Sequence, residues 1–240
     1  MILGKNIHLS SKFIQNINPY SVAVPSDFRN RPEDILDSTL KNQVQIVAEE
    51  TLTLEAQLGI RNTSSIIEAS NIENIGEYDK SGVFIKSESL KNDRYQLFVS
   101  NQGAAETATQ VIHHNQNITH ISPPGRIISG SNFTAEIKGD FENKVSWVNV
   151  LRNVNINLTS FTQIGLMISQ VYQNKYLHYR EETYCSRKIF GKCIKRKTRK
   201  IPFYTYGIIQ TNGIKLPSFI DAGGSLTGYG PGKFQLESKN

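Results

Sequence analysis

The chain has 240 residues, of which 38% are hydrophobic and 20% are charged, so it is large enough and apolar enough to bury a core. This composition excludes disorder as the main state, and no apolar run reaches the roughly eighteen residues that a membrane-spanning helix requires. The N-terminal residues MILGKNIHLSSKF lack the apolar run of a signal peptide, and the sequence leaves the localisation open.

The net charge of +6 is concentrated in one segment. Residues 180–200 carry nine Lys/Arg and two Glu, a local charge of +7, whereas the rest of the chain has 18 basic and 19 acidic residues. The remainder of the protein is therefore nearly neutral, which argues against a protein that packs nucleic acid through a generally basic surface.

The N-terminal 31 residues show no sustained hydrophobic period, and we expect an irregular arm over 1–31, followed by a single β-rich domain over 32–240. A helix is predicted over about 33–50. Asn30-Arg31-Pro32 resembles a helix start, and apolar residues then follow at spacings of four, four and three: Leu36, Leu40, Val44 and Val47.

A half-buried strand is predicted from Leu52 to Ile60, because apolar residues alternate there with polar residues or glycine. The alternative is that residues 33–60 form one continuous helix. Beyond Asn62, short runs of strand-forming residues are separated by turn residues such as Pro123-Pro124-Gly125, and we find no internal repeat. The predicted fold is mainly β: an antiparallel β-sandwich or barrel with one N-terminal helix and a long protruding β-hairpin.

The hairpin is predicted as an arm over 163–214, with CSRKIFGKC at its tip. If Cys185 faces Cys193, opposed residues have numbers that add to 378, which pairs Glu182 with Arg196 and Glu181 with Lys197. We therefore expect a disulfide between the cysteines and cross-strand ion pairs from Glu181 and Glu182. Two free thiols are the alternative, and the spacing suits neither a Cys-x-x-Cys redox site nor a four-ligand zinc site.

The basic tip is the candidate contact surface, since Lys and Arg next to aromatic rings suit an anionic membrane surface or a partner subunit. The alternative without a binding role is a solvent-exposed edge hairpin whose lysines prevent aggregation through its edge strands. The expected membrane or partner contacts are Arg187, Lys188, Phe190, Lys192, Lys195, Arg196, Lys197, Arg199 and Lys200.

Catalytic and metal chemistry is not predicted. Adjacent His113 and His114 point to opposite faces of a strand, so they cannot ligate one ion together. The sequence has no nucleophile elbow, and no pair of acidic residues stands out as an acid and base couple. We expect neither an enzyme nor a cofactor.

The strand and turn rhythm of RYQLFVSNQG and ISPPGRIISGSNFTAEIKG resembles, in outline, membrane-damaging β-sandwich proteins of the actinoporin and aegerolysin families. The resemblance covers residues 33–150 and implies a sandwich that attacks membranes, with no functional residue carried over, because the cysteine-bracketed hairpin departs from both families. The leading expectation is a non-enzymatic, membrane-binding, pore-forming or toxin-like protein that forms a homo-oligomer. The alternatives are a structural subunit of a symmetric assembly, such as a virion, tail or crystalline inclusion, and a nucleic-acid-binding module.

Overall fold

A computed structural model describes residues 1–24, 39–40, 43–70 and 81–229 of the chain, and its named elements are all β-strands. The chain divides into two compact units. The solenoid unit comprises Met1–Val99, Ile118–Ile168 and Ile214–Asn240, and the ribbon unit comprises Ser100–Asn117 and Ser169–Gly213.

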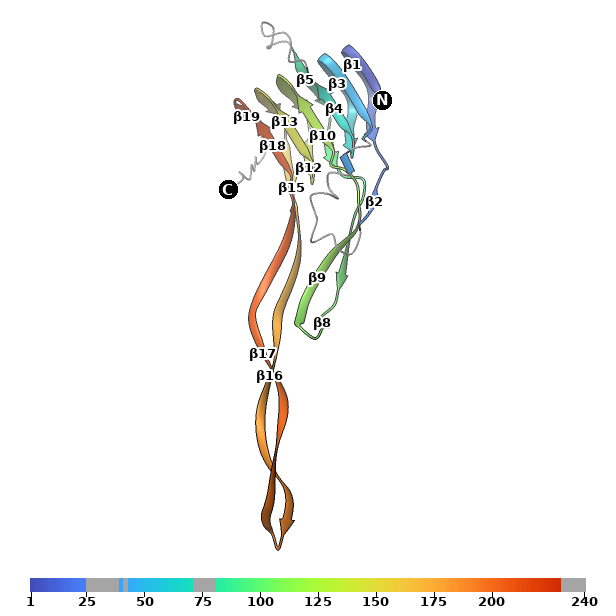
Figure 1. Cartoon of the computed structure of the whole chain (residues 1–240). Helices are drawn as coiled ribbons and strands as arrows, with labels where there is room; N and C mark the ends of the chain where they lie inside the picture. The colour runs from blue at the N-terminus through green and yellow to red at the C-terminus, as the bar shows by residue number, and fades with distance from the viewer. Residues whose placement is uncertain (25–38, 41–42, 71–80, 230–240) are drawn as a thin grey trace. The chain divides into compact units, whose positions relative to one another are not determined.

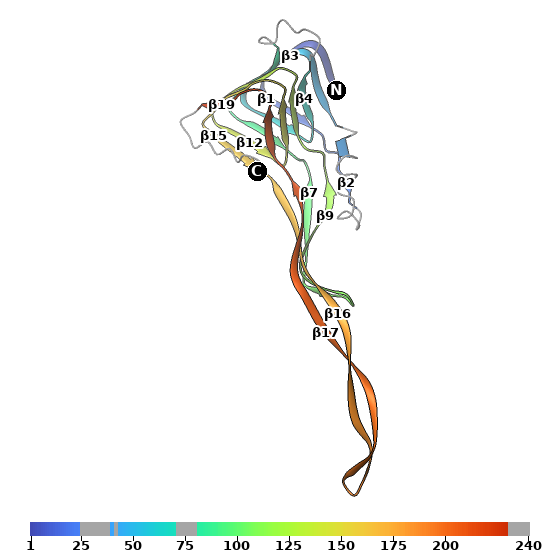
Figure 2. The same cartoon turned by 60° about the vertical axis from the view of Figure 1, so that its left-hand side comes forward.

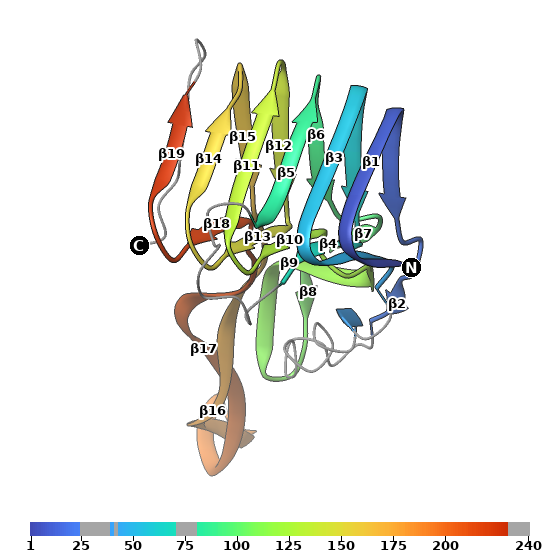
Figure 3. The ribbon, with the colours of Figure 1, turned by 90° about the horizontal axis from the view of Figure 1, so that it is seen from above.

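The solenoid unit is a parallel sheet that coils on itself, and its successive turns lie side by side (Figures 1 and 3). The first two turns are the long bent strands β1 (Ile2–Ile17) and β3 (Gln45–Thr63). The third turn is divided into β4 (Ile66–Ala69), β5 (Gly82–Ser87) and β6 (Leu90–Asp93). The fourth turn is β10 (Arg126–Ser129), β11 (Asn132–Ile137) and β12 (Asp140–Lys144). The fifth turn is β13 (Trp147–Val150), β14 (Val154–Asn157) and β15 (Ser160–Ile164), and the sixth contains β18 (Phe219–Ala222) and β19 (Leu226–Tyr229).

Each residue of a turn stacks on the equivalent residue of the next turn. One such stack joins Ile46, Ile67, Ile127, Val148 and Ile220 through parallel pairing of β3, β4, β10, β13 and β18. A second set of strands runs β3, β5, β11, β14 and β19, and a third runs β3, β6, β12 and β15. The coil therefore has three sides, and side chains that alternate inward fill its interior.

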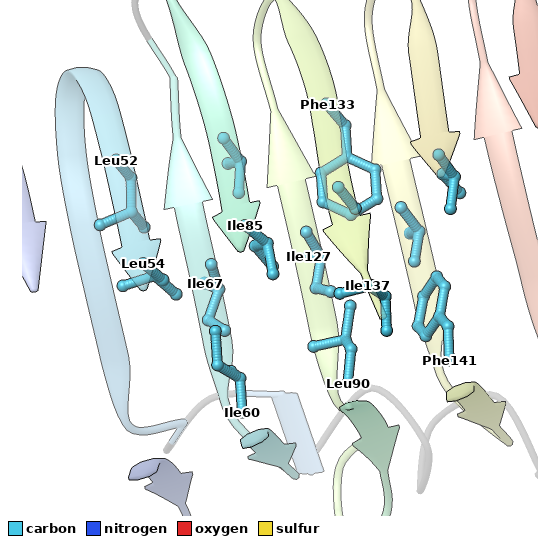
Figure 4. Packing of buried hydrophobic residues seen from close by; sticks show 14 of the residues in the cluster. Leu52, Leu54, Ile60, Ile67, Ile85, Leu90, Ile127, Phe133, Ile137 and Phe141 are labelled. Carbon is cyan, nitrogen blue, oxygen red and sulfur yellow. The ribbon is translucent and has the colours of Figure 1, made fainter. Parts of the chain in front are cut away.

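The interior is a continuous apolar core. Leu52 and Leu54 of β3, Ile85 of β5, Phe133 of β11 and Phe141 of β12 are all buried, and Figure 4 shows them along neighbouring strands. Burying each such side chain contributes about 1.5–3 kcal/mol to the free energy of unfolding. The strand predicted at Leu52–Ile60 is thus confirmed as the middle of β3.

The predicted mainly β fold is confirmed, but the predicted antiparallel pairing is wrong, because the large sheet is parallel. A coil with one inward and one outward face gives the same alternation of apolar and polar residues as a sandwich strand, so periodicity alone cannot separate the two. The segment GRIISGSNFTAEIKG contributes β10 and β11 to this coil, so the resemblance to actinoporins and aegerolysins has no support in the fold.

The predicted N-terminal helix is also not borne out. Gln45–Glu50, its C-terminal third, form the start of β3, which pairs with β1 on one side and β4 on the other. Ile46 and Ala48 point inward with a period of two, and this pairing overrides the helical spacing of Val44 and Val47. Residues 25–38 and 41–42, which include the predicted helix start, lie outside the described residues.

The segment expected to be an irregular arm contains a long strand. Residues 2–17 form β1, whose Ile7 and Ile14 are buried against β3. Because β1 closes one end of the coil and pairs with β3 alone among the described strands, few of its side chains need to be apolar, and its period is weak. The short strand β2 (Val22–Ala23) follows and pairs with Ile121 and His120.

A column of stacked asparagine side chains runs through one corner of the coil. The Nδ2 of Asn16 donates to the Oδ1 of Asn62, Asn62 donates in the same way to Asn92, and Asn92 donates to Asn143, each at 2.9 Å. Asn143 then donates to the backbone carbonyl of Phe219 at 3.1 Å. All four asparagines are buried, so each turn satisfies the amide of the turn before it.

Substituting Asn92→Ala should lower the free energy of unfolding by roughly 2–4 kcal/mol, because the amide of Asn62 loses an acceptor and the carbonyl of Asn143 loses a donor inside the coil. Urea denaturation followed by far-ultraviolet circular dichroism measures the change. Asn155→Ala is the matched control, since Asn155 is exposed on β14. Equal losses in the two variants would contradict a stabilising role of the column.

Candidate partner-binding hairpin

The last third of the chain contains a long hairpin of β16 (Leu166–Ile189) and β17 (Lys192–Leu216). Figures 1 and 2 show these two strands twisting around each other along their length. Phe190 and Gly191 form the connecting turn, and both have positive φ, of 49° and 76°. A two-residue turn of this kind has the same twist as the strands it joins, and glycine adopts positive φ without steric cost.

In the ribbon unit, β17, β16 and β9 are neighbours in that order. Residues 170–174 of β16 pair with 110–115 of β9 (Gln110–Ile121), and β8 (Ala105–Glu106) pairs with β9 as well. The strand β7 (Leu97–Gln102) also pairs with β9. Beyond residue 174, β16 pairs with β17 alone among the described strands, so most of the hairpin is a two-stranded ribbon.

The two cysteines form a disulfide, as the sequence predicts, with their Cα atoms 5.7 Å apart. It crosses the hairpin near the turn, within a segment whose side chains are nearly all exposed. The disulfide therefore restrains the tip, whose residues belong to neither hydrophobic cluster of the described part of the chain.

The register inferred from the cysteines does not extend along the hairpin. Glu182 accepts two hydrogen bonds from Arg199, at 2.8 and 2.7 Å, where Arg196 was the expected partner. The Oγ of Ser186 donates to the carbonyl of Lys195. Both contacts join residues whose numbers add to 381, which matches a two-residue turn at 190–191 rather than the sum of 378 expected from the cysteines. An ion pair of Glu181 with Lys197 stays a prediction.

Charge divides the hairpin into a charged half that includes the turn and a neutral half farther from the turn. Residues 180–200, the charged half, contain the nine basic residues and both glutamates. Residues 169–179 and 201–213, the neutral half, contain a single lysine or arginine, Lys175, and no carboxylate. The predicted contact residues from Arg187 to Lys200 all lie exposed in the charged half.

The lone cation of the neutral half is neutralised locally. Lys175 Nζ contacts the carboxylate of Glu106 and lies 3.9 Å from the ring centroid of Tyr204. The hydrogen bond to Glu106 is the main cause that raises the pKa of Lys175 above its usual value, which keeps the ammonium charged and paired. The neutral half thus presents no unpaired charge from Lys175.

Large apolar and aromatic side chains cover the neutral half. Ile208 is 85% exposed and Ile209 58% exposed, at adjacent positions on β17. Each of the other members is at least 41% exposed: Tyr176, Leu177, Tyr179, Phe203, Tyr204 and Tyr206. Sequence reasoning missed Ile208 and Ile209 as contact residues, although the charge-free run IPFYTYGIIQTNGI was the signal that could have found them.

The histidines considered in the sequence lie apart from any ligand cluster. His113 contacts the side chain of Gln173, and its ring makes that contact on the exposed surface of β9. Within the described ranges, no three His, Cys, Asp or Glu side chains are grouped so as to hold a metal ion. The same part of the chain contains no helix that is long and apolar enough to cross a membrane.

Comparison with models of protein families, with curated proteins and with solved structures finds no match to this chain.

Replacing both cysteines by serine should loosen the tip and leave the coil intact. A crosslink over so short a segment contributes about 2–3 kcal/mol in the chain-entropy model, and here that contribution acts on the ribbon. Hydrogen exchange followed by mass spectrometry should show faster exchange in 182–199 and unchanged exchange in Asn132–Ile137 of β11. Unchanged exchange at the tip would contradict this role for the disulfide.

Proposed function

We propose that the protein is a non-enzymatic structural subunit of a symmetric assembly, in which the neutral half of the hairpin is covered by another copy of the chain. The observation that carries the proposal is the exposure of Ile208, Ile209 and their aromatic neighbours on a two-stranded ribbon. A scattering of exposed apolar residues is ordinary, whereas so many large apolar side chains on one short stretch of ribbon support an interaction surface, although adjacent residues such as Ile208 and Ile209 point to opposite faces.

The stability of the ribbon points in the same direction. A two-stranded hairpin by itself is marginally stable in water, and independent stability requires a third strand or a packed face. Here β9 supplies a third strand over residues 170–174 alone. A partner that covers the neutral half would supply what the remaining length lacks.

The charge pattern favours a protein partner over the lipid interior. The hairpin tip carries Arg187, Lys188 and Lys192 around the turn, and basic side chains are disfavoured in the hydrocarbon region of a bilayer. A partner that covers the neutral half leaves these side chains in water.

The wild-type protein should form a defined oligomer in size-exclusion chromatography with light scattering, without lipid. The double substitution Ile208→Glu and Ile209→Glu should dissociate it, because two carboxylates would be buried without partners in the covered surface. The matched control is Thr183→Glu with Thr198→Glu, which adds the same charge to the charged half and should leave the oligomer intact.

A monomeric wild-type protein at every concentration up to about 100 μM, where a contact of Kd 1 μM would be nearly saturated, would overturn the proposal. So would an oligomer that both double variants leave unchanged, since it would then form through another surface.

Contact with an anionic membrane surface is the second candidate, and the exposure of Phe190 favours it. This side chain is fully exposed at the turn, among basic residues that anionic headgroups attract by about 1 kcal/mol each. An aromatic ring at such a tip could enter the headgroup region while the lysines and arginines contact phosphates. Pore formation is a further step within this candidate.

If the tip binds membranes, the protein should co-sediment with vesicles that contain phosphatidylserine and not with phosphatidylcholine vesicles. Phe190→Ser should weaken that binding by roughly ten- to a hundredfold, since one buried aromatic ring contributes roughly 1.5–3 kcal/mol. Phe203→Ser, in the neutral half, is the control and should bind normally. Equal binding to both vesicle types would contradict this candidate, and release of an entrapped dye would separate pore formation from surface binding.

A further inference from the structure

We infer that a small carboxylate with a short apolar chain binds in a cavity of the solenoid unit, with its carboxylate group on Arg94. This site lies in the coil, so it does not depend on the assembly proposed for the hairpin. The cavity has a volume of about 390 Å³ and lies at the carboxyl ends of β6, β12 and β15, which are parallel neighbours. Ligand pockets in proteins have volumes of roughly 300–1,000 Å³.

Two hydrogen bonds to the backbone hold the guanidinium of Arg94 at this cavity. Its Nε donates to the carbonyl of Val145 at 2.8 Å, and its Nη1 donates to the carbonyl of Ser122 at 2.5 Å. A guanidinium has five N–H groups, and the other three make no hydrogen bond to another described residue. The guanidinium is thus fixed in place before a ligand arrives, which lowers the entropy cost of binding.

Two carboxylates line the cavity, but each of them pairs with a cation other than Arg94. The Oε2 of Glu142 lies 3.3 Å from the Nζ of Lys91. The Oδ2 of Asp93 lies 3.3 Å from an Nη2 nitrogen of Arg61. Within the described residues, neither carboxylate forms an ion pair with Arg94.

The cavity therefore has an excess of positive charge. The cations that line it and have no carboxylate partner among the described residues are Arg94 and Lys144. Burial lowers the pKa of Arg94 to about 9, because the charged guanidinium is poorly hydrated there. An anion in the cavity would supply the missing opposite charge, and hydrogen bonds between charged groups are stronger than those between neutral ones.

The two sides of the cavity differ in polarity. All of its charged lining residues lie at the ends of β6 and β12 or, in the case of Arg94, directly after β6. Residues 164–166, an isoleucine, a glycine and a leucine, lie beyond β12 at the end of β15 and the start of β16. Leu97 and Val145 add apolar surface from the second hydrophobic cluster. A ligand that is charged at one end and apolar at the other matches this arrangement.

The fork of the guanidinium favours a carboxylate as the charged end. A planar carboxylate can accept two parallel N–H bonds from one guanidinium, which adds geometric specificity to the charge attraction. The apolar side leaves no comparable set of donors for the additional oxygens of a phosphate, because residues 164–166 carry no polar side chain.

Isothermal titration calorimetry of the full-length protein with sodium hexanoate tests the inference. Hexanoate should bind, and hexanol should bind about tenfold more weakly or less, because it has the same chain without the charge. Acetate should bind roughly a hundredfold more weakly, since it lacks four methylene groups. No binding of hexanoate, equal binding of hexanol, or tighter binding of inorganic phosphate than of hexanoate would overturn the inference.

Two substitutions test the site by different routes. Arg94→Gln removes the guanidinium and should weaken hexanoate binding by about tenfold or more. Ile164→Trp should weaken it as well, because the larger ring fills the cavity while the hydrogen bonds of Arg94 remain. Lys12→Gln is the matched control, since it removes an exposed positive charge of β1 outside the cavity and should leave hexanoate binding unchanged.

Wild-type affinity for hexanoate in a folded Arg94→Gln variant would overturn the inference, and so would wild-type affinity in Ile164→Trp. Circular dichroism checks that each variant folds. If Arg94→Gln does not fold, Ile164→Trp and the comparison of hexanoate with hexanol decide the result, because neither requires a change at Arg94.

Discussion

The register of the coil depends on the column of asparagine side chains at one corner. An amide side chain has both a donor and an acceptor, so identical residues can bond to each other from turn to turn without leaving a buried group unsatisfied. A one-residue slip of the second, third or fourth turn would break two of these bonds and rotate the apolar side chains out of the core. The column from Asn16 to Asn143 therefore fixes the alignment of successive turns. The hydrophobic stacks specify this alignment less strictly, because their side chains are similar in shape at neighbouring positions.

The same corner is where the chain leaves the coil. The connection from β3 to β4 and that from β12 to β13 are two residues long, with Ser64 and Val145 at positive φ. The connections from β1 to β3, from β6 to β10 and from β15 to β18 are much longer, and the last of them contains the hairpin. Each long connection is inserted between residues that remain stacked, as the parallel pairing of β13 with β18 shows. Long surface insertions cost little extra closure entropy, which is why the coil tolerates them.

These insertions also explain which features the sequence could predict. Adjacent turns without an insertion are 21 residues apart, as Ile127 and Val148 are, but the equivalent residue of the next turn, Ile220, follows 72 positions later. The repeat is therefore hard to detect in the sequence, and strand periodicity does not determine whether neighbouring strands are parallel or antiparallel.

The hairpin and its disulfide were predictable because their signals are local: two long strand-like runs, two cysteines and a short connection. The register was not, because it depends on a turn at Phe190 and Gly191 that the cysteine spacing does not specify. The neutral half is hard to predict from the sequence as a contact surface, because an absence of charge is a weaker signal than a cluster of lysines.

A coil whose alignment is enforced residue by residue has a consequence for how such a protein can change. The strand β10 pairs with β13 across a two-residue connection between turns, and β13 pairs with β18 in the same parallel sense across more than fifty residues, so selection can lengthen, shorten or replace the hairpin without disturbing the turns on either side. The coil would then change slowly in sequence, whereas the hairpin could be exchanged and would diverge faster. Descendants of one ancestral protein could acquire different attachments in this way while retaining the asparagine column almost unaltered.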